Sequence, residues 1–276
     1  MTFHNKFKVK TLMALVLVGA FNIAQAAVET KQPGVLTIGS DLTWAPYDYL
    51  IEGKAAGFDA DLMKLLSKSL GIKTQTEDTR FANLVLGLTG RHFDVIASAL
   101  YITPERAKQI SYIPYLKTGG SLMTLKGSDF KPQTQKDLCG KKVASLKGAA
   151  WVPALNKLST GYCSENKLGL ITVQEYASSP LAAQALLSHA ADVQFDDAAV
   201  SQMLVTQTKG RLQITSKTIL DPVIIGLGVA KENHQLLTAL TDALEEQKKN
   251  GSYQALLKKY NLQEPSADEI AAAFKG

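Results

Sequence analysis

The sequence has few of the groups on which catalysis and metal binding usually depend. Its 276 residues include four histidines, which are far apart in the chain, and two cysteines. It contains no glycine-rich phosphate-binding loop, no closely spaced set of metal ligands and no nucleophile elbow. We therefore expect no catalytic residue, no metal site and no cofactor.

The chain also lacks an apolar run of the roughly 20 residues that a membrane-spanning helix needs. A shorter apolar run at 12–21 follows three lysines within 6–10 and precedes the small residues of 24–26. This order of basic, apolar and small residues predicts a secretory signal peptide over 1–26, cleaved after Ala26. Because no cysteine lies near that site, we expect a soluble, exported product without a lipid anchor.

A strong excess of charge of one sign is missing as well. The formal net charge of +5 comes from 30 Lys and Arg against 25 Asp and Glu, and three of those lysines belong to the leader, which holds no acid. The remaining charge of +2 gives no reason to expect a nucleic-acid partner. With 46% hydrophobic and 20% charged residues, the chain has the composition of a globular protein and the length of one large or two small domains.

The two cysteines, Cys139 and Cys163, are interpreted in the light of export. In an oxidising compartment, a pair separated by 24 positions favours a disulfide over a redox or metal site. Two buried thiols are the alternative. A disulfide that closes a loop of this length stabilises a fold by roughly 3 kcal/mol in the chain-entropy model.

Strand and helix patterns alternate along the chain, which predicts an α/β fold with parallel strands. The expected strands are short apolar runs, at 35–40, 94–97, 142–146, 171–176, 193–195 and 223–229. The expected helices show apolar residues at helical spacing or a capping pair at their start. They cover 58–70 before Gly71, begin at Thr103-Pro104, Ala149 and Ser179-Pro180, and end the chain over 236–244 and 253–260.

Arg106 stands in the first turn of the helix that begins at Thr103-Pro104. The helix dipole disfavours a cation there by roughly 0.3 to 1 kcal/mol. A guanidinium kept in that position suits a carboxylate, which its planar fork binds through two hydrogen bonds. The alternative is an arginine that bends into solvent or pairs with Glu105, and the motif alone leaves both open.

Asp197 follows the predicted strand 193–195, at the carboxyl end where open α/β sheets place their ligands. Its carboxylate is a candidate partner for an ammonium group. Alternatively, Asp196 or Asp197 caps the helix that follows.

Other strand ends carry further candidates. Gly148, between a strand and a helix, leaves backbone N–H groups that form a candidate anion site. Asp41, Trp44 and Phe81 place an acid and two aromatic rings near strand ends. Each of these three is either a ligand contact or a residue of the core.

A set of short motifs occurs in a fixed order along the chain. They are Val35 to Asp41, Pro46-Tyr47, Gly57-Phe58-Asp59-Ala60-Asp61-Leu62, Phe93-Asp94-Val95-Ile96, Thr103-Pro104-Glu105-Arg106, Pro114-Tyr115, Asp137-Leu138-Cys139-Gly140-Lys141 and Gly251-Ser252-Tyr253. Together they resemble the periplasmic amino-acid-binding proteins of ABC importers, the solute-binding family 3. The resemblance runs from about Val35 to Leu262.

The resemblance implies a two-lobed, type II periplasmic-binding-protein fold, with two parallel-sheet lobes joined by a two-strand hinge. Lobe 1 would comprise 27–119 and 223–276, and lobe 2 would comprise 120–222, with crossings near Gly119-Gly120 and Asp221-Pro222. It also implies a periplasmic receptor that closes over an amino acid and delivers it to an ABC permease in the inner membrane. We expect a monomer with no enzymatic activity.

The resemblance further assigns residues to a ligand site. Arg106 would bind the ligand α-carboxylate, helped by Ser98 and the backbone near Tyr101, while Asp197 would take the α-ammonium. The other expected contacts surround the ligand side chain or line the second lobe: Asp41, Trp44, Phe81, Ala99, Leu146, Ala149, Ala150 and Trp151. Asp41 favours a ligand whose side chain bears nitrogen, and the aromatic rings suit stacking on an aromatic or cationic group.

This chain departs from the family pattern within that site. Relatives often carry hydroxyl residues after the glycine at 148, whereas Ala149-Ala150 leave only backbone N–H groups for the carboxylate. Ala99 and Tyr101 stand where small or hydroxyl residues are common. These departures bear on which side chain the ligand carries.

Two rival functions follow from the same resemblance. A periplasmic dehydratase-like enzyme of this fold, acting on a cyclic carboxylate, would need a general acid or base in the cleft. An aspartate kept for an α-ammonium argues against that enzyme. The sensor portion of a receptor would need a membrane anchor.

Overall fold

The structure, a computed structural model, describes residues 1–2 and 28–275. The predicted signal peptide therefore lies almost wholly outside the described residues, as does its cleavage site after Ala26. In the described part, no helix is both long and apolar enough to cross a membrane.

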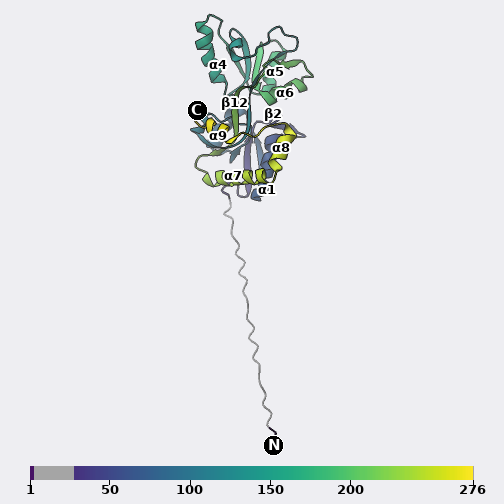
Figure 1. The fold of residues 1–276 in the computed structure, drawn as a ribbon, viewed down its shortest axis with the longest axis vertical. Helices are drawn as coiled ribbons and strands as arrows, with labels where there is room; N and C mark the ends of the chain where they lie inside the picture. Colours follow the sequence, from purple (N-terminus) through teal and green to yellow (C-terminus); the bar gives the residue numbers. More distant parts are fainter. Residues whose placement is uncertain (3–27, 276) are drawn as a thin grey trace.

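Two lobes lie one above the other in Figure 1. The first lobe, at the bottom of the view, carries helices from both ends of the described chain: α1 (Phe58–Leu70), α7 (His234–Lys249), α8 (Ser252–Tyr260) and α9 (Ala267–Ala273). The second lobe, at the top, carries α4 (Val152–Leu158), α5 (Ser179–Leu187) and α6 (Ala198–Gln207).

The strands of the first lobe form one edge of a large sheet and a small separate sheet. In the large sheet, β1 (Val35–Ser40) pairs in parallel with β5 (Lys73–Asp78) and β6 (Val95–Ile96). The small antiparallel sheet consists of β2 (Thr43–Trp44), β3 (Asp48–Ile51) and β4 (Lys54–Ala56). Short helices follow the strands: η1 (Phe81–Asn83), α2 (Leu84–Thr89) and α3 (Pro104–Ala107).

The second lobe repeats this scheme. Strand β8 (Lys142–Leu146) pairs in parallel with β9 (Thr172–Tyr176) and β10 (Val193–Asp197). The remaining elements of this lobe are η2 (Gln135–Leu138), η3 (Ser159–Cys163) and β11 (Leu212–Ile214).

Two long antiparallel strands, β7 (Ile110–Leu125) and β12 (Leu220–Ala230), connect the lobes. Strand β7 pairs with β12 over its first part and with β10 and β11 over its last part. The predicted crossings fall inside this pair, where Gly120 faces Leu220 and Thr118 faces Val223. The two-lobed α/β architecture is thus confirmed.

The sheet differs from the expected pair of parallel sheets. Nine described strands form one continuous sheet in the order β5-β1-β6-β12-β7-β10-β8-β9, with β11 on β7. Strand β12 is antiparallel to β6, and β7 is antiparallel to β10. The reason is geometric, because each hinge strand enters a lobe in the direction opposite to that lobe's own parallel strands.

Local sequence signals explain most helix boundaries. Helix α1 spans the predicted residues, and Gly71 ends it in the left-handed conformation at φ 66. Thr103 caps α3 as predicted, since its hydroxyl accepts the backbone N–H of Arg106. The cap of α5 is Ser178, one residue earlier than predicted, and α4 begins at Val152, after Ala149.

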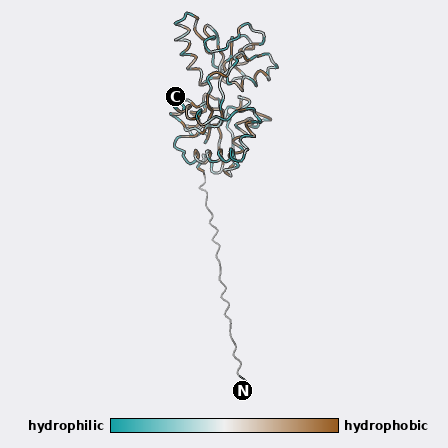
Figure 2. The backbone as a smooth tube through the Cα atoms, in the orientation of Figure 1, coloured by the Kyte–Doolittle hydropathy of each residue, from teal (hydrophilic) through white to brown (hydrophobic). Residues whose placement is uncertain are grey.

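The outer helices are amphipathic. Along α7, Leu236, Leu240 and Leu244 recur on the buried face, and Figure 2 shows apolar and hydrophilic residues interspersed along the outer helices. Packing of this face positions the strand ends, because it fixes each lobe as a rigid unit around its part of the sheet.

Candidate functional site

Arg106 connects the two lobes. Its Nη1 donates a hydrogen bond to the carbonyl of Tyr101 at 3.0 Å, and its Nη2 donates to the carbonyl of Gly148 in the second lobe at 2.9 Å. The guanidinium carbon lies 5.3 Å from the centre of the Phe81 ring. Burial lowers the pKa of Arg106 from its usual value. The first-turn arginine therefore points into the region between the lobes.

Asp197 is the last residue of β10, and it is fully buried. Its Oδ1 accepts the backbone N–H groups of Ala199 and Val200, so Asp197 is the cap of α6. The same carboxylate also faces the first lobe and the hinge. The two roles that the sequence left open, helix cap and cleft-facing acid, are thus combined in one residue.

Three hydroxyl groups donate to the carboxylate of Asp197 from outside the second lobe. Tyr47 donates to Oδ1 at 3.1 Å, while Tyr101 and Thr118 each donate to Oδ2 at 2.7 Å. Burial is the largest cause that raises the pKa of Asp197, and the hydroxyl donors oppose it. Sequence reasoning missed Tyr47 and Thr118 as partners of this carboxylate, although Tyr47 belongs to the Pro46-Tyr47 motif.

Asp196 also contacts the first lobe. Its Oδ1 accepts the indole N–H of Trp44 at 3.3 Å, and that N–H donates to Ser179 Oγ at 2.9 Å. Gln194 and the backbone of Asp197 donate further hydrogen bonds to Asp196. Burial raises the pKa of Asp196 to about 6. Trp44 therefore ties the first lobe to two polar side chains of the second.

Asp41, at the end of β1, is held within its own lobe. Its side chain accepts hydrogen bonds from the Thr43 hydroxyl at 2.6 Å and from the Phe81 backbone N–H at 2.8 Å. Arg80 Nη1 lies 2.8 Å from Asp41 Oδ1 and forms an ion pair with it. Burial raises the pKa of Asp41, and Thr43, Phe81 and Arg80 act in the opposite direction.

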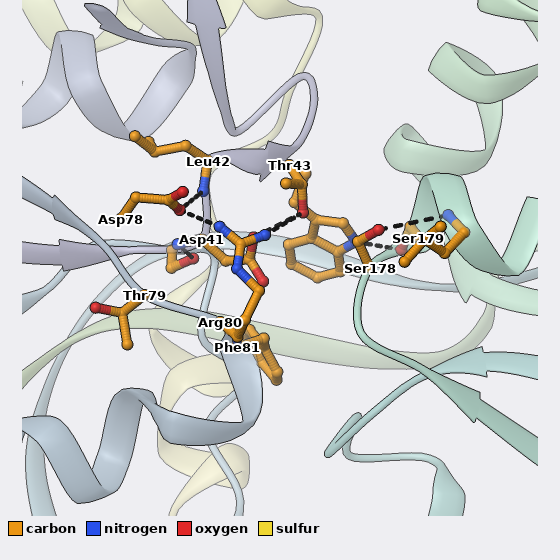
Figure 3. A network of polar contacts seen from close by, with 12 residues as sticks. Asp41, Leu42, Thr43, Asp78, Thr79, Arg80, Phe81, Ser178 and Ser179 are labelled. Atoms are coloured by element: carbon orange, nitrogen blue, oxygen red, sulfur yellow. Dashed lines mark hydrogen bonds and ion pairs between the residues drawn. The ribbon is translucent and has the colours of Figure 1, made fainter.

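Figure 3 shows this network around the Arg80 guanidinium. Arg80 also contacts Asp78 and Thr43, and Asp78 accepts the backbone N–H of Leu42. Sequence reasoning missed Arg80, although it directly precedes Phe81. The arrangement leaves the Asp41 carboxylate with three partners from its own lobe.

Ser98 and Ala99 support the site from behind. The Ser98 hydroxyl oxygen accepts the backbone N–H of Asp41 at 2.9 Å. The Ala99 backbone N–H donates to Asp59 at 2.6 Å, and Ala99 adopts a positive φ of 42. Both residues are buried, and neither of them lines the gap between the lobes.

The other predicted contacts converge on one narrow gap between the lobes, which leaves no space for a water-sized molecule in this structure. Its lining residues are Trp44, Phe81, Tyr101, Arg106, Leu146, Ala149, Ala150 and Trp151. Trp44 lies 5.7 Å from Phe81, and Tyr101 lies 5.8 Å from Trp151, between ring centres. Asp41, Ser98, Ala99 and Asp197 do not line this gap. The surface around it is mostly aromatic and aliphatic, with one cation.

In this structure a protein carboxylate takes the N–H group of the candidate anion site at Gly148, so a ligand at that site stays a prediction. The Gly148 N–H donates to the Glu175 carboxylate at 3.0 Å, and the Ala149 N–H donates to the carbonyl of Leu146. Because α4 begins only at Val152, the residues after Gly148 form a turn that bonds internally. A carboxylate of the protein itself therefore takes the N–H group that the sequence assigned to a ligand.

The predicted disulfide is confirmed. Cys139 and Cys163 are bonded, with 5.4 Å between their Cα atoms. The bond joins the end of η2 to the end of η3 in the second lobe. In the described part of the chain, no group of three or more metal-ligating side chains is found.

Known proteins match this chain over nearly its whole described length. Residues 36–263 match the model of the bacterial extracellular solute-binding proteins, family 3. An L-cystine-binding protein of Escherichia coli (strain K12) is 27% identical over 256 residues, covering 90% of this chain and 92% of that protein. The histidine-binding periplasmic protein of the same strain is 30% identical over 261 residues, covering 91% and 96%.

A solved structure shows the same architecture. An ancestral arginine-binding protein bound to glutamine superposes with a TM-score of 0.75 at 31% identity, covering 83% of this chain and 98% of that chain. The family match covers most of the chain, and the relatives share its full two-lobed length. The chain therefore belongs to the bacterial extracellular solute-binding proteins, family 3.

Proposed function

We propose that this protein is a receptor that captures an amino acid between its two lobes and delivers it to the permease of an ABC importer. Family membership supports this function, as do the binding functions named for the relatives. The observation that carries it is that one residue, Tyr101, is hydrogen-bonded to both a cation and an acid. Arg106 donates a hydrogen bond to the Tyr101 carbonyl, and the Tyr101 hydroxyl donates one to the Asp197 carboxylate.

In the proposed complex, the ligand exchanges with these protein groups. The α-carboxylate takes the guanidinium hydrogen bonds that Arg106 now gives to the carbonyls of Tyr101 and Gly148. The α-ammonium takes the Asp197 oxygen that now accepts the Tyr101 hydroxyl. Such a ligand contacts an arginine of the first lobe and an aspartate of the second at the same time. It makes both contacts only when the lobes are closed, and so it shifts the equilibrium toward the closed form.

Closure requires a hinge, and β7 and β12 are the segments that connect the lobes. We place the lobe boundaries at 119/120 and 222/223, inside this strand pair. No covalent step is needed. We further propose that the protein is exported to the periplasm by a signal peptide cleaved after Ala26, acts as a monomer, and has no nucleic-acid partner.

The dehydratase alternative gains little from the geometry. General acid–base catalysis needs a titratable group within hydrogen-bond reach of the substrate. Among the described residues that line the gap, only Arg106 and Tyr101 are titratable, and the carboxylate next to it, that of Asp197, is assigned in the proposed complex to the α-ammonium and accepts the Tyr101 hydroxyl. We therefore propose binding without turnover. Nuclear magnetic resonance of bound candidates, amino acids and cyclic carboxylates alike, should show each ligand unchanged after prolonged incubation.

Calorimetry with a panel of amino acids tests the proposal. Arg106→Ala should lower affinity by about tenfold to a hundredfold or more, because a hydrogen bond to a charged group contributes about 1.5 to 3 kcal/mol. Arg91→Ala is the matched control, since Arg91 is an exposed arginine of the same lobe that pairs with Glu232 at 3.7 Å. Near-normal affinity in Arg106→Ala contradicts the carboxylate assignment.

A further inference from the structure

The Asp41 carboxylate already has a cationic partner inside the first lobe, the Arg80 guanidinium, which it shares with the exposed Asp78. Its two oxygens receive the Thr43 hydroxyl, the Phe81 backbone N–H and the Arg80 guanidinium. Asp41 itself is 1% exposed. A cationic ligand side chain that approached Asp41 would therefore have to displace the protein's own guanidinium.

Two other acids near the cleft have hydrogen-bond or ion-pair partners as well. Asp196 accepts hydrogen bonds from Trp44, Gln194 and the Asp197 backbone. Asp78 faces solvent, with 46% of its side chain exposed, and it contacts Arg80. Solvent and salt screen an exposed charge of this kind. Neither of these acids, nor any other carboxylate, is among the described residues that line the gap.

The lining of the gap favours an uncharged group. Trp44, Phe81, Tyr101 and Trp151 supply aromatic rings, and Leu146 and two alanines supply aliphatic surface. Burying a charge against such a surface without a charged partner is strongly unfavourable, and stacking of a cation on the aromatic rings offsets only part of that cost. An apolar or aromatic side chain is instead stabilised there by the area that it removes from water.

We propose that Arg80 is a specificity-determining residue, which neutralises Asp41 and so makes this receptor select amino acids with uncharged, apolar or aromatic side chains over those with cationic side chains. This inference rests on the proposed function and names its substrate class. It also reverses the expectation that Asp41 favours a ligand whose side chain bears nitrogen.

Calorimetry tests the selection directly. The purified chain is titrated with phenylalanine, leucine, methionine and glutamine, and then with arginine, lysine and ornithine. We expect the tightest uncharged ligand to bind at least tenfold more tightly than any cationic one, a difference of about 1.4 kcal/mol or more. Equal or tighter binding of a cationic amino acid overturns the inference and leaves the proposed function standing.

The variant Arg80→Met tests the cause. It keeps a long side chain but removes the cation, so the Asp41 carboxylate becomes free to meet a ligand cation. The affinity for arginine or lysine relative to the best uncharged ligand should rise about tenfold. The same substitution at the exposed Arg91 is the control and should leave the ratio unchanged.

A second variant separates specificity from damage to the fold. Arg80→Met combined with Asp41→Asn removes both charges, so the gain for cationic ligands should disappear while thermal unfolding reports whether each variant folds. An unchanged ratio in folded Arg80→Met overturns the role of Arg80. Failure of every amino acid to bind the natural chain overturns the proposed function, and this inference with it.

Discussion

Each lobe ends a buried strand with a carboxylate, and the two carboxylates are matched in different ways. Asp41, after β1, is held by Arg80, Thr43 and the Phe81 backbone, all from its own lobe. Asp197, at the end of β10, receives hydroxyl groups from the first lobe and from the hinge. Acids at the carboxyl ends of strands therefore serve different purposes in the two lobes.

The difference teaches which of the two acids can respond to closure. The partners of Asp41 all belong to the first lobe, so we expect lobe opening to leave them in place. Tyr47 and Tyr101 contact Asp197 across the boundary between the lobes, so we expect opening to break these hydrogen bonds. The hydrogen bonds of Asp197 thus depend on the position of the hinge, whereas those of Asp41 depend only on the first lobe.

The largest expected effect follows from replacing Asp197 with Asn. This change keeps the size of the side chain and one acceptor oxygen but removes the charge that the ligand α-ammonium requires. Affinity for an amino acid should fall by about 2 to 5 kcal/mol, while affinity for its deaminated analogue should fall much less. Calorimetry with both ligands measures the difference.

The comparison of the two acids supplies the controls for that experiment. Asp41→Asn should change the affinities for the two ligands by similar factors, because Asp41 does not contact the α-ammonium in the proposed complex. Asp196→Asn tests the register of the strand end. Two results would place the ammonium site elsewhere. One is that Asp197→Asn lowers the affinities for the amino acid and for its deaminated analogue by the same factor. The other is that Asp196→Asn lowers the affinity for the amino acid, relative to the analogue, by more than Asp197→Asn does.

The next effect concerns stability, and it is confined to the second lobe, where the disulfide lies. Replacing Cys139 and Cys163 with Ser should lower the free energy of unfolding by about 3 kcal/mol, because the bond closes a loop across a separation of 24 residues. Urea unfolding of the oxidised natural chain and the double variant measures it. Neither cysteine lines the gap between the lobes, so ligand affinity at low temperature should stay within about twofold. A change of less than about 1 kcal/mol contradicts the expectation.

Elements with strong apolar patterns were predictable from sequence, and those without them were not. Helix α1 occupies the expected residues because its buried side chains recur at helical spacing, and strand β1 does so because it is a short, mostly apolar run in which every residue after Val35 is buried. Strand β5, with the sequence Lys-Thr-Gln-Thr-Glu-Asp, is a mostly exposed edge strand and carries no such signal. Strand β7 contains Pro114 and Gly119-Gly120, which interrupt the pattern of a long strand.

The site shows the same limit. Strand-end position predicted Asp41 and Asp197, and it did not predict their partners. Arg80 reaches Asp41 because β5 pairs with β1 in a register that sets Asp78 beside Ser40, and the polar edge strand gave no sign of that register. Tyr47 and Thr118 approach Asp197 from 150 and 79 positions away. Contacts this distant depend on how the lobes pack, which no local pattern encodes.

A buried acid pair of the first lobe leads to the smallest expected effect. Asp48 lies near Asp59, and burial raises the pKa of Asp48 well above its usual value and that of Asp59 to about 6. The Asp48 Oδ2 atom has no hydrogen-bond partner among the described residues. Above pH 4, an unfolded chain has released these protons while the folded chain still binds them. The free energy of unfolding therefore falls as the pH rises from about 4 through the raised pKa values.

Asp48→Asn removes one of the two titrating groups and keeps the shape of the side chain. The fall in unfolding free energy between pH 4 and pH 8 should become shallower than in the natural chain, with the variant gaining most at pH 8. Urea unfolding at several pH values measures the slope, and Asp242→Asn on the exposed face of α7 is the control that should leave it unchanged. A slope in Asp48→Asn equal to that of the natural chain would show that Asp48 ionises in the folded state as it does in the unfolded one. The pH dependence would then belong to the acids that face the cleft, Asp196 and Asp197, whose pKa values burial also raises.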